Sequence, residues 1–155
     1  MMGVLAETVL QAGGEAIGVI PRHLEEKGLA LTTVTSLRVV ENMHVRKALM
    51  AELSDAFIAL PGGFGTAEEF FEALTWAQLG LHTKPCGLLN VHGYFDHLIR
   101  FVDHAVHEQF IAPVHGSLLL VADSSEGLLD QLDSWQPPTL DKAAWAARLL
   151  KDCGS

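Results

Sequence analysis

Apolar residues along the chain follow two alternating patterns: short runs rich in branched side chains, and longer segments in which apolar residues recur every three or four positions. The short runs predict buried β-strands, and the longer segments predict helices that cover a sheet. Strands are expected at Ala16–Ile20, Leu37–Val40, Ala56–Leu60, Cys86–Val91 and Leu118–Ala122. Helices are expected at Gly3–Gln11, Met43–Leu53, Thr66–Leu79, Tyr94–Glu108 and Ser125–Leu132, with a terminal helix over residues 140–151.

The alternation of strands and helices predicts βαβ units around a parallel sheet. The expected fold class is α/β, a Rossmann-like three-layer sandwich with a mostly parallel sheet, formed as a single nucleotide-binding domain over residues 1–155. Local signals support several boundaries: Gly13 and Gly14 end the first helix, Pro21 closes the first strand, and Ser124 or Ser125 caps a later helix.

Charge and cysteine content narrow the range of partners. A net charge of −9 argues against nucleic acid and anionic membranes, which would require a basic face, but leaves room for a small anionic ligand. No apolar run approaches the roughly 18 residues of a membrane span. Cys86 and Cys153 form neither a disulfide framework nor a zinc pattern. We therefore expect a protein of the cytoplasm.

The strongest chemical signal is a glycine-rich loop between a predicted strand and a predicted helix. The run Asp55–Leu60 leads directly into Pro61-Gly62-Gly63-Phe64-Gly65-Thr66. Glycines let the backbone approach an anion, and the first amides of the helix supply donors for phosphate oxygens. Thr66 can cap the helix or donate its hydroxyl to the same phosphate. The alternative is a tight turn with no ligand, and the loop has neither a Walker lysine nor GxGxxG spacing.

Charged residues flank this loop in the sequence. Glu68 and Glu69 are expected in the first turn of the helix, where the dipole alone would favour a carboxylate. A carboxylate so close to a phosphate can also reach the anomeric carbon of a ribose, and there stabilise positive charge or activate water. Upstream, the segment Met43-His44-Val45-Arg46-Lys47 opens a helix. Arg46 is either a bidentate ligand of phosphate or carboxylate or a solvated surface charge.

These motifs resemble the Lonely Guy family, the cytokinin riboside 5′-monophosphate phosphoribohydrolases, over about the first 120 residues. The resemblance rests on Met43–Lys47, on the PGGxGTxxE signature within Ala56–Glu69, on Thr75–His82 and on Lys84–Val91. It implies cleavage of the N-glycosidic bond of an adenine-type nucleoside 5′-monophosphate, giving a free base and ribose 5-phosphate without a metal or redox cofactor.

Carried over residue by residue, the resemblance makes Arg46 and Glu69 the catalytic pair. It lines the substrate site with Lys47, Gly62, Gly63, Gly65, Thr66, Glu68 and Thr75. It also implies a homodimer, which the apolar character of the helix at Thr66–Leu79 on more than one face favours independently. A catalytically silent nucleotide sensor is the alternative function.

The sequence departs from the family in two places. Family members usually begin with two strands, a helix and a glycine-rich turn, and only the end of that turn is matched, by Met1-Met2-Gly3. We therefore expect an N-terminally truncated domain. A family glutamate that contacts the nucleotide falls on Gly28, and either Glu25 or Glu26 is a candidate substitute.

Other candidate chemistry has simpler explanations. His97, His104 and His107 punctuate a helix whose apolar residues already explain it as a cover for the sheet, so no metal site is expected. Aromatic residues of the helix at Thr66–Leu79 suit core packing better than base stacking. Cys86 lies within a strand pattern and is expected to be a buried, inert thiol.

Overall fold

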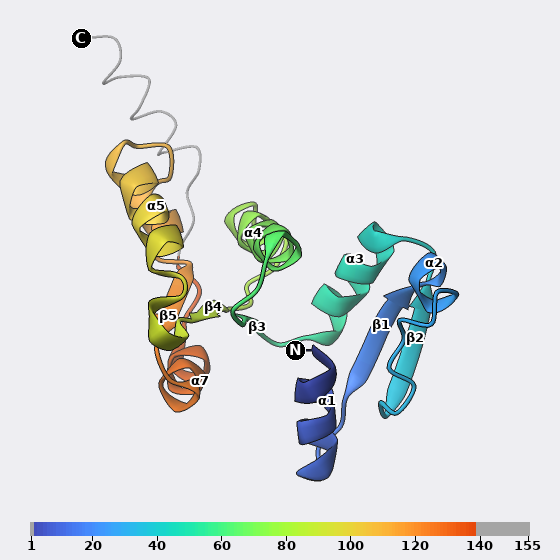
Figure 1. The fold of residues 1–155 in the computed structure, drawn as a ribbon. Coiled ribbons are helices and arrows are strands. Elements are labelled where there is room, and N and C mark those ends of the chain that lie inside the picture. Colours follow the sequence, from blue (N-terminus) through green and yellow to red (C-terminus); the bar gives the residue numbers. More distant parts are fainter. Residues whose placement is uncertain (1, 139–155) are drawn as a thin grey trace, which may run out of the picture. The chain divides into compact units, whose positions relative to one another are not determined.

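The computed structural model describes residues 2–138, so the terminal helix expected over residues 140–151 lies outside the described residues. Helices alternate with parallel strands, which confirms the predicted α/β, Rossmann-like class. The chain divides into two compact units, Met1–Ser54 and Asp55–Ser155, and each is described by itself (Figure 1).

The first unit is a parallel two-stranded sheet with helices. Its strands pair in register from Ile17 opposite Ser36 to Pro21 opposite Val40, and the third helix contacts both strands. Its elements are α1 Met2–Gln11, β1 Ile17–Pro21, α2 Arg22–Glu25, β2 Ser36–Val40 and α3 Met43–Leu53. The glycine signal was correct, because Gly13 has a positive φ of 81° and its amide closes the end of α1 on the carbonyl of Leu10.

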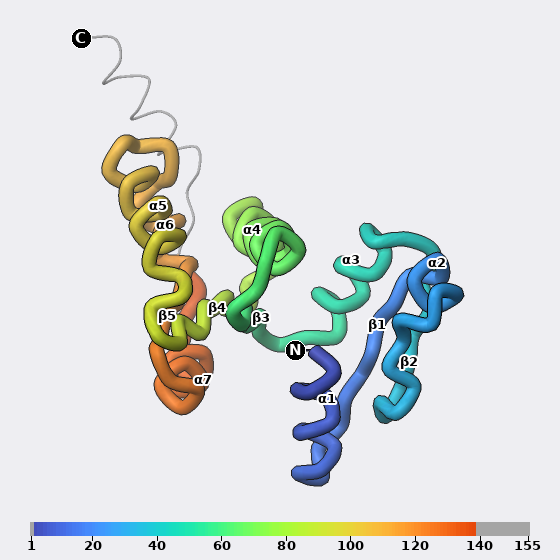
Figure 2. The backbone as a smooth tube through the Cα atoms, in the orientation of Figure 1, coloured from blue at the N-terminus to red at the C-terminus, as the bar shows by residue number. Residues whose placement is uncertain are grey.

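The second unit is a three-stranded parallel sheet in the order β3-β4-β5. Figure 2 follows the chain within this unit from β3 through α4 to β4. Its elements are β3 Phe57–Ala59, α4 Phe64–Gln78, β4 Cys86–Leu89, the 3-10 helix η1 Val91–Gly93, α5 Asp96–His107, α6 Pro113–Gly116, β5 Leu119–Ala122 and α7 Ser125–Ser134.

Successive residues of β4 face opposite sides of this sheet, and helices pack on both sides. Cys86 and Leu88 are buried in a core shared with Phe70 of α4 and Phe95, the residue that precedes α5. Gly87 points to the opposite face, where an added Cβ would lie 2.7 Å from Leu128 of α7. Helices therefore cover both faces, which is the three-layer arrangement expected from the sequence.

The sequence pattern identified the longer elements and missed the short ones. All five strands and the helices α1, α3, α4, α5 and α7 occur where predicted, within a few residues. Ser124 is the N-cap of α7, since its side chain accepts a hydrogen bond from Gly127 at 3.2 Å. The one-turn elements α2, η1 and α6 were not predicted, because three or four residues are too few to show a helical period.

Interactions around His82 fix its protonation state. The Lys84 amide donates to Nδ1 at 3.1 Å, so Nδ1 carries no proton and Nε2 is the nitrogen that donates to the Ala73 carbonyl, at 3.0 Å. The imidazole also packs against the ring of Phe57, with 5.1 Å between the centroids. Burial lowers the pKa of His82 below its usual value, and the positive charge of Lys84 lowers it further, against the opposing effect of the Ala73 carbonyl.

This lowered pKa predicts a loss of stability in mild acid. The unfolded chain binds a proton at His82 below about pH 6.5, whereas the folded chain resists it, so the free energy of unfolding falls as the pH drops through that window. Urea unfolding from about pH 7.5 to about pH 5.5 measures the fall. We expect His82→Gln to reduce it, and His97→Gln, at an exposed position of α5, to leave it nearly unchanged. Equal pH dependence in all three proteins would contradict the assignment.

Candidate nucleotide-binding site

The glycine loop follows β3 and ends in the uncapped start of a long helix. Gly63 is the N-cap residue of α4, and no side chain caps the helix there. The first intrahelical bond runs from the Ala67 amide to the Gly63 carbonyl at 3.1 Å. The amides of residues 64–66 therefore precede the helical hydrogen-bond ladder and point toward the N-terminal end, where the helix dipole is positive. This arrangement suits a phosphate.

The helix begins two residues earlier than predicted, which corrects three assignments. Gly63 rather than Thr66 is the cap, because the backbone already turns helical at Phe64. Thr66 thus lies within the first turn. Glu68 and Glu69 were wrongly expected in the first turn, which contains no acidic residue, and they lie in the second turn instead. Dipole stabilisation weakens beyond the first turn, so it explains these carboxylates less well than expected.

The glycines of the loop have different reasons for being glycine. A Cβ on Gly62 would collide with the side chain of Thr66, whose own Cβ would be 2.9 Å away. A Cβ on Gly63 or Gly65 would meet nothing within 4 Å among the described residues. Neither of these two residues has the positive φ that demands glycine. Packing therefore explains Gly62, whereas Gly63 and Gly65 leave open backbone that a ligand can approach.

Tyr94 contacts the loop and was not identified from the sequence. Its hydroxyl donates a hydrogen bond of 2.7 Å to the Gly62 carbonyl, across 32 positions of the chain. The sequence pattern placed Tyr94 only at the start of a helix. Nothing local in the sequence marks this contact, because it depends on the pairing of β3 with β4.

The basic residues of the predicted site lie in the first unit, at the start of α3. Asn42 caps this helix by accepting a hydrogen bond from the Val45 amide at 3.0 Å. Arg46 follows in the first turn, is half-buried, and donates from Nε to the Val19 carbonyl of β1 at 3.1 Å. Lys47 is also half-buried. Arg46 is thus a side chain oriented by a strand, which disagrees with the alternative of a purely solvated surface charge.

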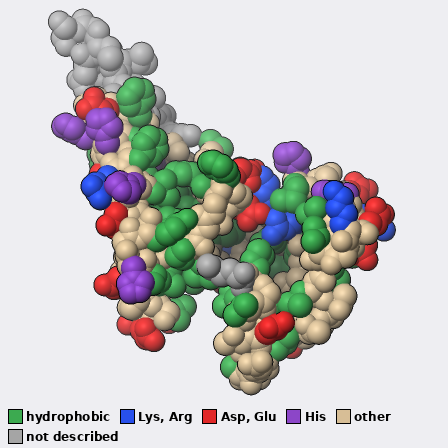
Figure 3. Space-filling view, in the orientation of Figure 1, with side chains coloured by type: hydrophobic (Ala, Val, Ile, Leu, Met, Phe, Trp, Pro, Cys, Tyr) green, Lys and Arg blue, Asp and Glu red, His purple; other side chains and the backbone are tan. Residues whose placement is uncertain are grey.

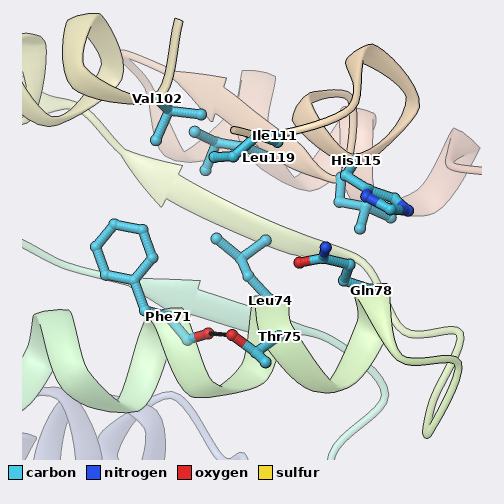
Figure 4. A pocket seen from close by; sticks show the side chains of 9 residues that line it. Phe71, Leu74, Thr75, Gln78, Val102, Ile111, His115 and Leu119 are labelled. Carbon is cyan, nitrogen blue, oxygen red and sulfur yellow. Dashed lines mark hydrogen bonds between the residues drawn. The ribbon is translucent and has the colours of Figure 1, made fainter. Parts of the chain in front are cut away.

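Thr75 lies well away from the glycine loop in the second unit. It is nine positions after Thr66 on the same helix, about 13.5 Å further along. Its hydroxyl donates to the Phe71 carbonyl at 2.7 Å. Thr75 is among the residues that line a pocket of about 150 Å³, which are Phe71, Leu74, Thr75, Gln78, Val102, Ile111, His115, Leu118 and Leu119. Figure 4 shows the pocket from close by.

Two residues that the sequence assigned to the core are buried in the structure. Phe70 is 5% exposed and Cys86 is 1% exposed, so both are core residues as expected. Burial raises the pKa of the Cys86 thiol to about 12, which keeps it protonated and unreactive. The histidines of α5 are exposed, and Figure 3 shows histidine side chains along the flank that carries this helix. Within residues 2–138, no three His, Cys, Asp or Glu side chains are grouped to hold a metal ion.

Gly28, the position at which the resemblance to the family predicts a glutamate, ends the short turn after α2. Its φ is +72°, a left-handed conformation that would strain a glutamate. Of the two suggested substitutes, Glu25 is the last residue of α2 and is half-buried, whereas Glu26 is exposed.

Comparison with known proteins gives the family. A family model described as "Possible lysine decarboxylase" matches residues 2–132, and the chain belongs to this family. The chain is 47% identical over 137 residues to the cytokinin riboside 5′-monophosphate phosphoribohydrolase LOG1 of Arabidopsis thaliana, covering 88% of this chain and 64% of that protein. It is 43% identical over 158 residues to the probable enzyme of the same name, LOGL6, of Oryza sativa subsp. japonica, covering 100% of this chain and 63% of that one.

A further relative, the probable phosphoribohydrolase LOGL9 of Oryza sativa subsp. japonica, is 51% identical over 137 residues, with 88% of this chain and 60% of that protein covered. These relatives confirm the Lonely Guy resemblance drawn from the motifs. The chain spans about three fifths of the length of the curated relatives it matches. Within the described part of the chain, no helix is both long and apolar enough to cross a membrane.

The unequal surroundings of the loop glycines predict unequal effects on folding. Gly62→Ala should lower the free energy of unfolding by about 1–3 kcal/mol, since the new methyl group competes with Thr66 for space. Gly65→Ala adds a methyl in open space within the first turn of α4, so stability should be unchanged or raised by up to about 1 kcal/mol. Urea unfolding of both variants measures the difference. Equal losses would contradict the distinction.

Proposed function

We propose that this protein hydrolyses the N-glycosidic bond of a cytokinin riboside 5′-monophosphate, releasing the free base and ribose 5-phosphate, and that AMP serves as a simpler substrate of the same class. The curated relatives are named for the first of these activities. In the reaction, water adds to C1′ of the ribose, the bond from C1′ to the base nitrogen breaks, and the nitrogen takes up a proton. No atom is oxidised or reduced, so the reaction requires no redox cofactor.

The observation that carries this proposal is the open glycine backbone at the start of α4. Gly63 and Gly65 leave room beside the first-turn amides, and a 5′-phosphate has the size and charge to occupy that place. Binding the phosphate there would hold the ribose near the second turn of the helix. A free amino acid such as lysine has no phosphate to bind in this way, so the loop favours a nucleotide over the substrate in the description of the family model.

Glu69 and Arg46 are proposed to provide the catalysis. Positive charge develops on the ribose as its bond to the base breaks, and the Glu69 carboxylate would stabilise that charge or take a proton from the attacking water. Arg46 would orient the phosphate or Glu69, which the bidentate guanidinium does well. Lys47, Thr66 and Glu68 are also proposed to contact the substrate. Thr75, about 13.5 Å further along α4 than Thr66, would contact only the end of the substrate remote from the phosphate.

The role of Glu69 predicts a specific defect. Glu69→Gln keeps the shape of the side chain but removes its charge and basicity, so release of adenine from AMP should fall at least a hundredfold, while the Kd for AMP stays within about threefold. Chromatography of the released adenine measures the rate, and calorimetric titration measures the Kd for AMP. Glu108→Gln, an exposed position at the end of α5, is the matched control and should retain activity.

The outcomes separate the enzyme from the sensor. Unchanged turnover in Glu69→Gln would remove this residue from the mechanism. A wild-type protein that binds AMP but releases no base would instead identify the chain as a nucleotide-binding module.

We also propose that the protein acts in the cytoplasm as a homodimer, with the C-terminal end of α4 at the interface. Leu79 is 54% exposed and Leu81 is 70% exposed just beyond this helix, an apolar surface that a second copy could cover.

The dimer prediction has a matched control on α7. Leu79→Glu should convert the dimer to a monomer, because it places a charge in an apolar contact. Leu129→Glu alters a leucine of almost equal exposure, 55%, and should leave the dimer intact. Light scattering during size-exclusion chromatography measures the mass of each. A folded wild-type monomer at micromolar concentration would disprove the proposal.

A further inference from the structure

Two loops meet at one edge of the sheet in the second unit. Strands β3 and β4 are parallel neighbours, with Ala59 opposite Leu88, so their carboxyl ends lie at the same edge. The glycine loop follows β3, and the turn that carries Tyr94 follows β4. The 2.7 Å hydrogen bond from the Tyr94 hydroxyl to the Gly62 carbonyl joins the two loops.

The turn that carries Tyr94 is held by Asn90. The backbone amide of Asn90 donates to the Ala122 carbonyl of β5 at 2.7 Å, which ties the turn to the sheet. Its side chain accepts a hydrogen bond from the Phe95 amide at 2.7 Å and donates one to Asp96 at 2.8 Å. Gly93 has a φ of +71°, and a Cβ there would lie 2.8 Å from an Asp96 oxygen, so the turn has little freedom.

The ring of Tyr94 is oriented although half of it is exposed. It is 53% exposed and stands edge-on to Phe95, with 5.0 Å between centroids and 89° between the ring planes. Phe95 itself is 7% exposed and belongs to the core. An edge-on contact of this kind is favourable in its own right. The hydroxyl therefore reaches Gly62 from a fixed support.

We propose that Tyr94 is the positioning residue of the phosphate loop, an inference that rests on the proposed function. The Gly62 carbonyl and the Gly63 amide belong to one planar peptide group and point in opposite directions. Holding the carbonyl therefore sets the direction of the Gly63 N–H, the amide directly before the first turn of α4. The hydrogen bond also polarises the peptide group, which makes that N–H a better donor to a phosphate oxygen.

Tyr94→Phe tests this role, because it removes the hydroxyl and keeps the ring against Phe95. Losing one neutral hydrogen bond that shapes the loop should weaken binding of AMP and of ribose 5-phosphate about three- to tenfold. Binding of adenosine, which has no phosphate, should not change. The phosphate is held equally in the ground state and the transition state, so KM should rise while kcat stays within about twofold.

Ser134→Ala is the matched control. The Ser134 hydroxyl donates to the Asp130 carbonyl, also at 2.7 Å, but at the end of α7. This variant should bind all three ligands as the wild type does. Urea unfolding of both variants shows whether weaker binding of AMP is accompanied by a lower free energy of unfolding of the whole protein.

A second measurement does not depend on ligand or activity. Amide hydrogen exchange at Ala67, whose amide donates to the Gly63 carbonyl of the loop, should be several-fold faster in Tyr94→Phe than in the wild type or Ser134→Ala. Unchanged exchange together with unchanged AMP affinity would overturn the role of Tyr94. If the wild type binds AMP but releases no base, the proposed hydrolase activity is overturned instead. The ratio of the AMP affinities of the wild type and Tyr94→Phe still tests the role of Tyr94 in that case. A wild type that binds neither AMP nor ribose 5-phosphate would overturn both the phosphate loop and its positioning residue.

Discussion

The parallel pairing of β3 with β4 is the constraint on which the second unit depends. It places the carboxyl ends of two neighbouring strands at one edge, and ligands of open α/β sheets bind at such edges. One strand leads into the glycine loop and the start of α4, and the other leads into the turn of Tyr94. The hydrogen bond between Tyr94 and Gly62 exists only because this pairing brings the two loops together.

Packing on both faces of β4 fixes the positions of the helices in the second unit. On one face of β4, Cys86 and Leu88 hold α4 against the sheet, so the N-terminal end of that helix has a defined position. On the other face, the absence of a side chain at Gly87 lets Leu128 of α7 approach closely.

The charged residues proposed for catalysis are supported in different ways within their own units. Arg46 is oriented by a hydrogen bond to the backbone of β1 and by its place in a helix that Asn42 caps. Glu69 follows the glycine loop by one turn of α4, which makes its distance from the loop a property of the helix itself. In the proposed hydrolysis, a fixed distance between the bound phosphate and the carboxylate would contribute to the rate.

The sequence by itself determined the alternation of strands and helices, the glycine loop and the family, because these depend on local periodicity and on contiguous motifs. Tertiary structure decided the features that no local sequence pattern encodes. It began α4 at Phe64 rather than Thr66, distinguished the crowded Gly62 from the open Gly63 and Gly65, and placed Thr75 at a pocket away from the loop. It also joined Tyr94 to Gly62, because contacts between residues far apart in the chain arise only when strands pair and helices pack.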